Sequence, residues 1–234
     1  MESIGMLAAG VAHEVGNPLT SISSLVQIIQ RTTEDDFTQE KLELIKNQVS
    51  RISRIIRDLV DYSRRSNHEE QPTDLNKSLR DAVEIVRVGR KAKDIAFDVS
   101  LATVLPPLML VPDQCEQVFI NLLINAVDAL VTTAPGRHAT PSGSRRIAVE
   151  SRADEDWVVV TIQDNGRGIP VADLPKIFEP FFTTKSVGQG TGLGLWVSYE
   201  IIKSFQGEIT VESAPEKGTR FTIRLPGPSH MLTR

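Results

Sequence analysis

The chain has 234 residues, of which 40% are hydrophobic and 24% are charged, and its formal net charge is −4. This length can bury the cores of one large or two small domains, and the weak negative charge provides no basic surface for a nucleic-acid partner. The sequence has neither a run of about 18 apolar residues that could cross a bilayer nor a secretory signal, so we expect no membrane segment and a cytoplasmic location. The single cysteine, Cys115, excludes an internal disulfide and is expected to be a buried structural thiol.

The first third of the chain carries two runs of apolar residues that alternate in steps of four and three, a pattern typical of coiled-coil seams. The runs are Ile4, Ala8, Val11, Val15, Pro18, Ile22, Leu25 and Ile29, and then Leu42, Ile45, Val49, Ile52, Ile56 and Leu59. The polar segment 31–38 between them indicates the turn of an antiparallel helical hairpin. Two helices cannot remove both seams from water, so we expect a homodimer in which two hairpins form a four-helix bundle. A monomeric hairpin that packs on the rest of the chain is the alternative.

His13 lies two residues after the seam position Val11, which places it on the outer face of the first predicted helix. Glu14 follows it and could accept a proton or hold the imidazole tautomer, and Asn17 projects over the same surface one turn further on. An exposed histidine alone is more often merely solvated. The other histidines lie in the predicted linker, a loop and the tail, and suggest no metal site: His68, His138 and His230.

Residues 9–19, Ala-Gly-Val-Ala-His-Glu-Val-Gly-Asn-Pro-Leu, resemble the H-box of dimerising sensor histidine kinases. The resemblance implies that His13 is phosphorylated on an imidazole nitrogen and that Glu14 assists as the base. It also implies that Asn17 occupies the position used to dephosphorylate an aspartate of the partner protein.

The polar stretch 63–73 ends in Gln-Pro-Thr-Asp, in which the proline discourages helix continuation and Thr or Asp can cap the next helix. We therefore expect a hairpin domain at 1–67, a linker at 68–73, a catalytic α/β domain at 74–226 and a tail at 227–234. In the α/β domain we predict helices at 74–90 and 112–131, and strands at 95–101, 108–111, 146–152, 157–164, 208–214 and 220–225. The fold class is a two-domain α+β chain, whose second domain is a mixed sheet with helices on one face.

The helix predicted at 112–131 has, on another side from its apolar stripe, a polar stripe made of Gln117, Asn121, Asn125 and Asp128. A solvated stripe would usually carry lysine and glutamate, whereas amide oxygens one turn apart suit a hydrated Mg²⁺ with phosphates. The pattern therefore indicates a helix that faces both a core and a ligand.

Two glycine-containing segments complete the candidate ligand site. Asp164-Asn165-Gly166-Arg167-Gly168 follows an apolar strand, where a carboxylate can accept a hydrogen bond from an exocyclic amino group; an Asx turn is the structural alternative. Residues 188–195, Gly-Gln-Gly-Thr-Gly-Leu-Gly-Leu, precede an apolar helix, and glycines at a helix N-terminus favour phosphate. No strand directly precedes this segment and it lacks a Gly-Lys-Ser/Thr ending, so dinucleotide-binding and P-loop interpretations fit poorly.

Four motifs together resemble, in order and spacing, the N, G1, F and G2 boxes of the histidine-kinase ATP domain: the Asn121/Asn125 helix, residues 164–168, Phe178-Glu179-Pro180-Phe181-Phe182 and residues 190–195. Residues 125–130, Asn-Ala-Val-Asp-Ala-Leu, resemble the nitrogen-regulation type. The resemblance implies a Bergerat (GHKL) α/β sandwich that binds ATP and Mg²⁺, with residues 170–190 as a mobile lid. Asn125 would hold Mg²⁺, Asp164 would bind adenine, Thr219 would support Asp164 through water, and Lys185 would reach the terminal phosphate. The ATP-binding residues implied are Asn121, Asn125, Asp128, Asp164, Gly166, Gly168, Ile169, Phe182, Lys185, Gly190, Thr191, Gly192, Leu193, Gly194, Leu195 and Thr219.

The function that this resemblance implies is that of a two-component sensor histidine kinase: ATP-dependent autophosphorylation of His13, transfer to an aspartate of a response regulator, and dephosphorylation of that regulator. Two alternatives remain open. One is an ATP-hydrolysing clamp like those of type II topoisomerases, Hsp90-like chaperones and mismatch-repair proteins. Such clamps typically carry a water-activating glutamate where this chain has Asn121. The other is a non-catalytic dimeric scaffold regulated by nucleotide binding or dimerisation.

Overall fold

A computed structural model describes residues 2–63, 69–131, 145–154, 156–185 and 190–227 of the chain. The backbone forms two compact units, one of residues 1–68 with 179–193 and the other of residues 69–178 with 194–234. Among the described residues, no helix combines the length and the apolarity needed to cross a membrane.

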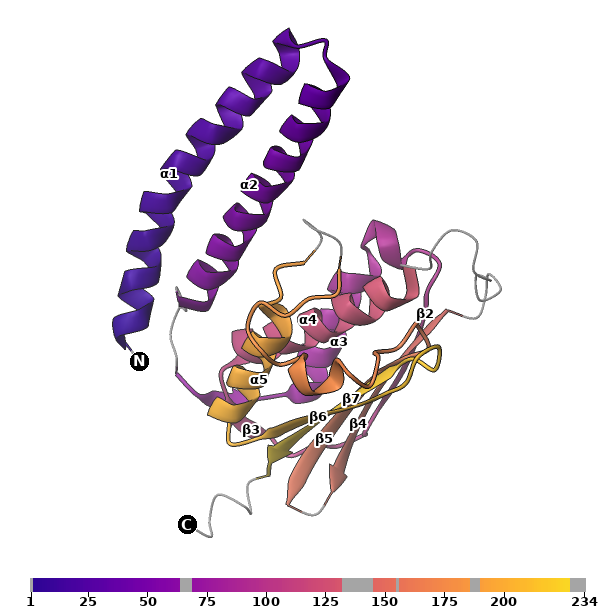
Figure 1. Ribbon diagram of the computed structural model, residues 1–234. Helices are drawn as coiled ribbons and strands as arrows, with labels where there is room; N and C mark the ends of the chain where they lie inside the picture. Colours follow the sequence, from indigo (N-terminus) through magenta and orange to yellow (C-terminus); the bar gives the residue numbers. More distant parts are fainter. Residues whose placement is uncertain (1, 64–68, 132–144, 155, 186–189, 228–234) are drawn as a thin grey trace. The chain divides into compact units, whose positions relative to one another are not determined.

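The first unit contains a hairpin of two long helices, α1 (Glu2–Thr32) and α2 (Asp36–Ser63), which lie side by side (Figure 1). Asp35 precedes α2, and its carboxylate accepts a hydrogen bond from the Thr38 amide at 2.8 Å. An acceptor at this position satisfies an amide that has no partner within the first turn of a helix. The turn between the helices is therefore fixed by the residues that begin α2.

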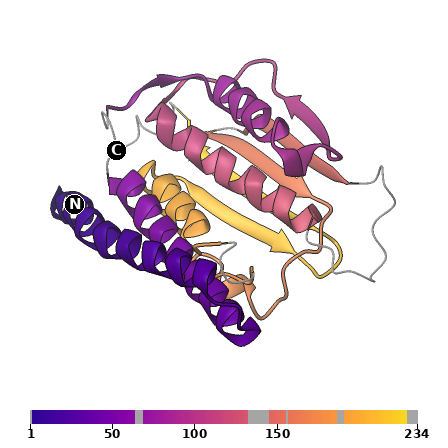
Figure 2. The same cartoon turned by 90° about the horizontal axis from the view of Figure 1, so that it is seen from above.

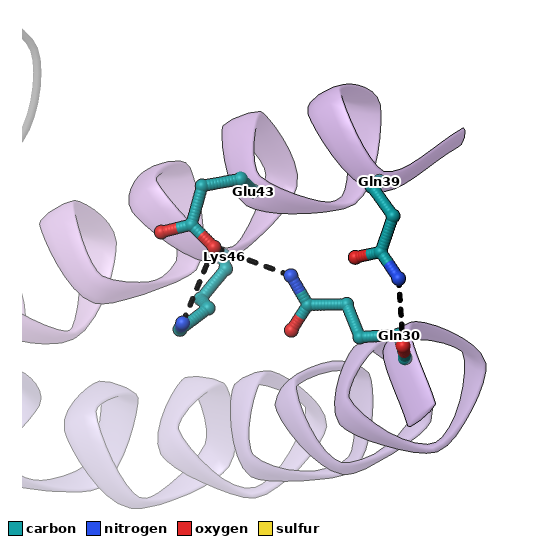
Figure 3. Close-up of polar contacts among 4 residues, drawn as sticks. All are labelled: Gln30, Gln39, Glu43 and Lys46. Atoms are coloured by element: carbon teal, nitrogen blue, oxygen red, sulfur yellow. Dashed lines mark hydrogen bonds and ion pairs between the residues drawn. The ribbon is translucent and has the colours of Figure 1, made fainter. Parts of the chain in front are cut away.

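Side chains also join the two helices next to this turn (Figure 3). Gln39 Nε2 donates to the carbonyl oxygens of Gln30 at 2.8 Å and Thr33 at 2.9 Å, which satisfies carbonyls at the end of α1. Gln30 Nε2 and Lys46 Nζ both donate to Glu43 Oε2 at 3.2 Å. The Gln30 amide and then the Lys46 ammonium hold the pKa of Glu43 below its ordinary value.

The contact between α1 and α2 uses a different face of α1 from the predicted seam. Leu19 and Val26 are buried, although the heptad pattern did not include them, and they are matched on α2 by buried Leu42 and Val49. Five predicted seam residues keep 40–60% of their surface exposed: Ile22, Leu25, Ile29, Ile45 and Ile52. Pro18 is also exposed, and Val15 and Ile56 are half-buried. The side chains of Ile4, Ala8, Val11 and Leu59 lie outside the described part of the structure.

The second unit is built on a five-stranded sheet with the order β2-β4-β5-β7-β6. The strands are β2 (Ala96–Leu101), β4 (Arg146–Asp154), β5 (Trp157–Asp164), β6 (Glu208–Ser213) and β7 (Thr219–Pro226). β2 and β4 are parallel and the other neighbours are antiparallel, which confirms the predicted mixed sheet. One face is covered by α3 (Leu75–Arg87), α4 (Pro112–Val131) and α5 (Gly194–Ser204), as Figure 2 shows. Two short 3₁₀ helices, η1 (Arg90–Ala92) and η2 (Leu174–Lys176), lie in the connections.

A separate two-stranded sheet pairs β1 (Gln71–Thr73) with β3 (Leu108–Leu110) in antiparallel register. The sequence placed residues 71–73 at the end of the linker and predicted no strand there, and in the structure these three residues form β1. Thr73 is buried, and its hydroxyl donates to the Leu110 carbonyl at 3.3 Å. The strand depends on a partner far away in sequence, which explains why local composition did not predict it.

The core of the second unit lies between the sheet and the helix layer. Its fully buried side chains come from the strands (Ile147, Ile162, Ile223) and from the helices (Leu79, Leu122, Leu123, Ile201, Ile202). Cys115 on α4 is also buried, and its burial raises the pKa of the thiol to about 12. The thiol therefore stays protonated at neutral pH, and the prediction that Cys115 is buried is confirmed.

A polar network around the buried Asn76 ties α3 to the end of β2 and to β4. Asn76 Nδ2 donates to the Ala102 carbonyl at 2.8 Å, and Asn76 Oδ1 accepts from the Ser151 hydroxyl at 2.7 Å. We expect Asn76→Ala to lower the free energy of unfolding by about 2 kcal/mol, because the Ala102 carbonyl loses its Asn76 donor and the buried Ser151 hydroxyl loses the acceptor of its proton.

Tryptophan fluorescence in a urea titration measures this loss, because the two tryptophans, Trp157 and Trp196, both lie in the second unit. Ser100→Ala, at an exposed position of β2, is the matched control and should change little. An Asn76→Ala change within about 0.5 kcal/mol of wild type would show that the network does not stabilise the fold.

Candidate functional site

Asp164, at the end of β5, is a buried carboxylate with only 4% of its surface exposed. Its Oδ1 accepts a hydrogen bond from the Gly166 amide at 2.7 Å, and the Thr219 amide on the adjacent strand β7 also stabilises the ionised form. Burial nevertheless dominates and raises the pKa of Asp164 to about 6. A desolvated carboxylate held by backbone amides is a strong hydrogen-bond acceptor for a ligand donor.

Glycines allow the loop after β5 to lie against two other segments. Gly168 has a φ of +67°, and a Cβ there would lie 2.0 Å from the Ala214 carbonyl oxygen. Gly218 has a φ of +81°, and a Cβ there would lie 2.0 Å from the Asp164 carbonyl oxygen. On the α4 side, the Arg167 amide donates to the Ala129 carbonyl at 3.3 Å. The loop at 165–169 is therefore held between the end of α4 and the β6–β7 turn.

Asn165 and Arg167, which flank Gly166, help to hold the loop at 165–169 in place. Asn165 Oδ1 accepts from the Arg146 amide at 2.8 Å, which ties the loop to the start of β4. The Glu216 amide donates to the Arg167 carbonyl at 2.8 Å, which ties the same loop to the β6–β7 turn. The Asx turn that the sequence offered as an alternative is therefore compatible with a ligand site. The Asp164 carboxylate accepts the hydrogen bond of the turn and is also the buried acceptor available to a ligand.

The predicted polar stripe of α4 is half-buried in the structure. Asn121 Nδ2 donates to the Gly194 carbonyl at 3.4 Å, so the stripe contacts the N-terminus of α5, where Leu195 follows Gly194. Asp128, further along α4, forms an ion pair of 2.7 Å with Lys91 of η1. The structure thus brings Asn121 and Gly194 together, and gives Asp128 a cationic partner that the sequence did not indicate.

Residues 178–193 contain the F box and the first part of the second glycine-rich segment. The Phe178 ring packs against Tyr199 and Phe221, with ring centroids 5.4 Å and 6.5 Å apart, and so belongs to the core of the second unit. Gly192 has a φ of +74°, and a Cβ there would lie 2.3 Å from the backbone of Phe181, which itself has a φ of +68°. The predicted ligand residues that belong to the first unit are Phe182, Lys185, Gly190, Thr191, Gly192 and Leu193.

The candidate phospho-acceptor residues lie on α1. His13 and Glu14 are within the helix, but their side chains are outside the part that the structure describes. Asn17 is exposed, one turn further on. His68, His138 and His230 also lie outside the described residues.

Ser213 is a polar residue of the site region that sequence reasoning missed. It lies at the end of β6, and its hydroxyl contacts the Ile169 amide at 2.8 Å, the Gly218 carbonyl at 2.8 Å and the Thr219 hydroxyl at 3.0 Å. The only sequence signal was its position at the end of a predicted strand, five residues before Gly218.

Two family models match the chain. Residues 3–68 match the His Kinase A (phospho-acceptor) domain, and residues 110–229 match the histidine kinase-, DNA gyrase B- and HSP90-like ATPase domain. The second match covers half of the chain and includes Asp164, the glycines that hold its loop, and α4.

Named relatives and a solved structure agree with these matches. The signal transduction histidine-protein kinase AtoS of Escherichia coli (strain K12) is 37% identical over 226 residues, which are 97% of this chain and 35% of AtoS. Sporulation kinase E of Bacillus subtilis (strain 168) is 33% identical over 223 residues, 95% of this chain and 28% of that kinase. The chain thus spans about a third of the length of these relatives.

The solved structure of histidine kinase ThkA in complex with the response regulator protein TrrA aligns with a TM-score of 0.64 and 26% identity. The alignment covers 99% of this chain and 63% of that one. The chain therefore belongs to the histidine kinases, with a phospho-acceptor domain followed by an ATPase-type catalytic domain.

Proposed function

We propose that this chain binds Mg-ATP, transfers the γ-phosphoryl group to His13 and passes it to an aspartate of a response-regulator receiver domain. The observation that carries the proposal is the buried Asp164 carboxylate, which accepts a hydrogen bond from a backbone amide in a loop whose glycines pack closely against neighbouring backbone. The first helix of the same chain carries His13. An acceptor of this kind suits the exocyclic amino group of adenine.

Magnesium would be held by Asn125 together with the phosphates of the nucleotide. Among the residues that the structure describes, no group of three or more acidic, histidine or cysteine side chains could hold a metal ion. An amide oxygen on the half-buried stripe of α4, with phosphate and water oxygens as the other ligands, suits the preference of Mg²⁺ for oxygen. The cation would neutralise charge on the phosphates during transfer.

Phosphoryl transfer needs mainly positioning and charge neutralisation. We propose that residues 1–67 present His13, with Glu14 as the base, and that residues 74–226 bring the nucleotide to it. The linker lies between these domains and ends at β1, which pairs with β3 and so anchors the chain to the catalytic domain. In the segment 170–190, proposed to be the lid over ATP, Lys185 would contact the terminal phosphate.

The active form proposed for the chain is a homodimer. Ile22, Leu25 and Ile29 of α1 and Ile45 and Ile52 of α2 remain exposed beside the buried contact of the hairpin. Burying such a side chain contributes about 2 kcal/mol, so a second hairpin that covers both runs would gain substantial stability. These exposed residues lie apart from Leu19 and Val26, which are buried between the two helices of one hairpin. Their position supports a four-helix bundle over a monomeric hairpin.

A response regulator is the proposed partner, because ThkA, whose structure aligns with 99% of this chain, is seen with the response regulator TrrA. Asn17 is exposed on α1 and would orient the water that removes phosphate from the regulator's aspartate. We expect Asn17→Ala to slow this dephosphorylation by about 10-fold or more, while His13 labelling continues.

The measurement is the loss of label from a phosphorylated receiver domain mixed with each variant in the presence of ADP. Asn47→Ala, at an exposed position of α2, is the matched control. Dephosphorylation by Asn17→Ala at the wild-type rate would show that Asn17 has no part in this reaction.

The kinase activity is tested by incubating the protein with γ-labelled ATP and Mg²⁺. We expect acid-labile, alkali-stable label on wild type and on His230→Gln, and none on His13→Gln. ATP hydrolysis without labelled protein would instead support an ATP-hydrolysing clamp, and ATP binding with neither reaction would support a scaffold.

A further inference from the structure

Three polar side chains form a row across three adjacent strands of the second unit. Asp164 of β5 is opposite Thr219 of β7, and Thr219 is opposite Ser213 of β6. Residues that are directly opposite in antiparallel strands project from the same face of the sheet, with Cβ atoms about 5 Å apart. Asp164 and Thr219 are each 4% exposed, so the row lies in a largely desolvated region.

The contacts of Ser213 fix the position of every proton in its hydroxyl network. A serine hydroxyl has one proton and two lone pairs. The Ile169 amide can only donate to it, and the Gly218 carbonyl can only accept from it, both at 2.8 Å. Ser213 therefore donates its proton to Gly218, and the Thr219 hydroxyl, 3.0 Å away, donates to the remaining lone pair of Ser213.

This arrangement determines what Thr219 offers to a ligand. Because its only proton is directed at Ser213, the Thr219 hydroxyl has only lone pairs to offer to a ligand, and Asp164 is its direct neighbour on the adjacent strand. The ionised Asp164 carboxylate also offers only lone pairs. Two adjacent acceptors in a desolvated site favour a base that carries an amino group, because the amino group can donate to them. They disfavour a base that carries a carbonyl oxygen at the same position, because that oxygen would face these acceptors without a proton between them.

We propose that Ser213 is a positioning residue that makes the base site selective for 6-amino over 6-oxo purines, by holding the Thr219 hydroxyl as an acceptor beside Asp164. The same hydroxyl also holds the loop after β5 to the β6–β7 turn through Ile169 and Gly218. This inference rests on the proposed binding of ATP, and it does not depend on phosphoryl transfer to His13.

The test compares the dissociation constants of ATP and inosine triphosphate, which carries a 6-oxo group, by competition against a fluorescent ATP analogue with Mg²⁺ present. We expect Ser213→Ala to reduce the preference for ATP by about 10-fold, the effect of one hydrogen bond in a desolvated site. Ser213→Thr keeps the hydroxyl and should restore the preference. Ser100→Ala, on the exposed part of β2, should bind both nucleotides as wild type does.

A purely structural role for Ser213 predicts a different result. Loosening of the loop would weaken the binding of ATP and of inosine triphosphate by the same factor. A preference of Ser213→Ala for ATP over inosine triphosphate that stays within about twofold of the wild-type preference would therefore overturn the proposal. Tryptophan fluorescence confirms that each variant is folded, because Trp157 and Trp196 report on this unit. A wild-type protein that binds neither nucleotide would overturn the proposed function as well, whereas wild-type ATP binding with an unchanged Ser213→Ala preference overturns the role of Ser213 alone.

Discussion

Asp164→Asn is expected to abolish most ATP binding and, at neutral pH, to make the second unit more stable. Asparagine keeps an oxygen for the Gly166 amide, which lies 2.7 Å from the carboxylate, but it removes the negative charge that a ligand's amino group would contact. Replacing a charged acceptor in a desolvated site should weaken ATP binding by about 100-fold.

The gain in stability follows from the sign of the pKa shift. Burial raises the pKa of Asp164 from 3.8 to about 6, so the folded state holds this proton more tightly than the unfolded state. The contribution of Asp164 to stability is thus complete below pH 3.8 and is lost as pH rises toward about 6. At about 1.4 kcal/mol per pKa unit, ionisation costs the folded wild type roughly 3 kcal/mol at neutral pH, which the asparagine variant avoids.

Urea titrations at pH 7.5 and at pH 4.5, followed by tryptophan fluorescence, measure this effect. The free energy of unfolding of Asp164→Asn should be larger than that of wild type at pH 7.5, and the difference between the two proteins should shrink at pH 4.5. Equal stability of the two proteins at pH 7.5 would contradict a desolvated carboxylate at this position. The same shift predicts that wild-type ATP affinity falls as pH drops below about 6, because the protonated carboxyl is a weaker acceptor.

Gly168→Ala should have the largest effect on folding of the second unit. A Cβ at this position would lie 2.0 Å from the Ala214 carbonyl oxygen, and a φ of +67° is unfavourable for alanine. The backbone conformation alone costs about 1–2 kcal/mol, and the overlap with the β6–β7 turn adds to it, so we expect a total loss of at least about 3 kcal/mol.

Gly194→Ala is the matched control, because the nearest atom to a Cβ there is Asn121 Cγ at an ordinary 3.6 Å, and the residue begins α5. Its free energy of unfolding should stay within about 1 kcal/mol of wild type. If Gly168→Ala were as stable as Gly194→Ala, the close approach of the loop to the β6–β7 turn would not occur in solution.

Local patterns predicted the elements whose signals are local. The bounds of α4 match the prediction of 112–131, because a proline begins the helix and an apolar stripe runs through its length. The strand at 157–164 was also predicted correctly, since a run of valines and isoleucine ends at the Asp-Asn-Gly turn. The mixed sheet with helices on one face followed from the order of these elements.

Features that depend on distant contacts were predicted less well. The heptad pattern identified both hairpin helices but could not tell which face each helix presents to the other, and so missed Leu19 and Val26. The end of α5 is another case: glycine usually supplies the positive φ that ends a helix, yet here Gln206, and not Gly207, has the positive φ of 57°. Gly207 instead allows a close approach to β7, where a Cβ would lie 2.6 Å from the Arg224 carbonyl oxygen.

The site residues show the same division. Asp164, Gly168 and Gly194 belong to contiguous motifs, from whose combination a ligand site was predicted. Ser213 has no such motif, because its role depends on the register of β6 with β7 and of β7 with β5. The ion pair of Asp128 with Lys91 likewise joins residues that are 37 positions apart.

The measurement that tests the central claim most directly is ³¹P nuclear magnetic resonance of the protein after incubation with Mg-ATP at alkaline pH. We expect a phosphoramidate resonance from wild type that is absent from His13→Gln and from Asp164→Asn, because one variant lacks the acceptor and the other lacks the nucleotide. A phosphoramidate resonance that persists in His13→Gln, or ADP formation by wild type with no protein-bound phosphorus signal, would contradict autophosphorylation of His13.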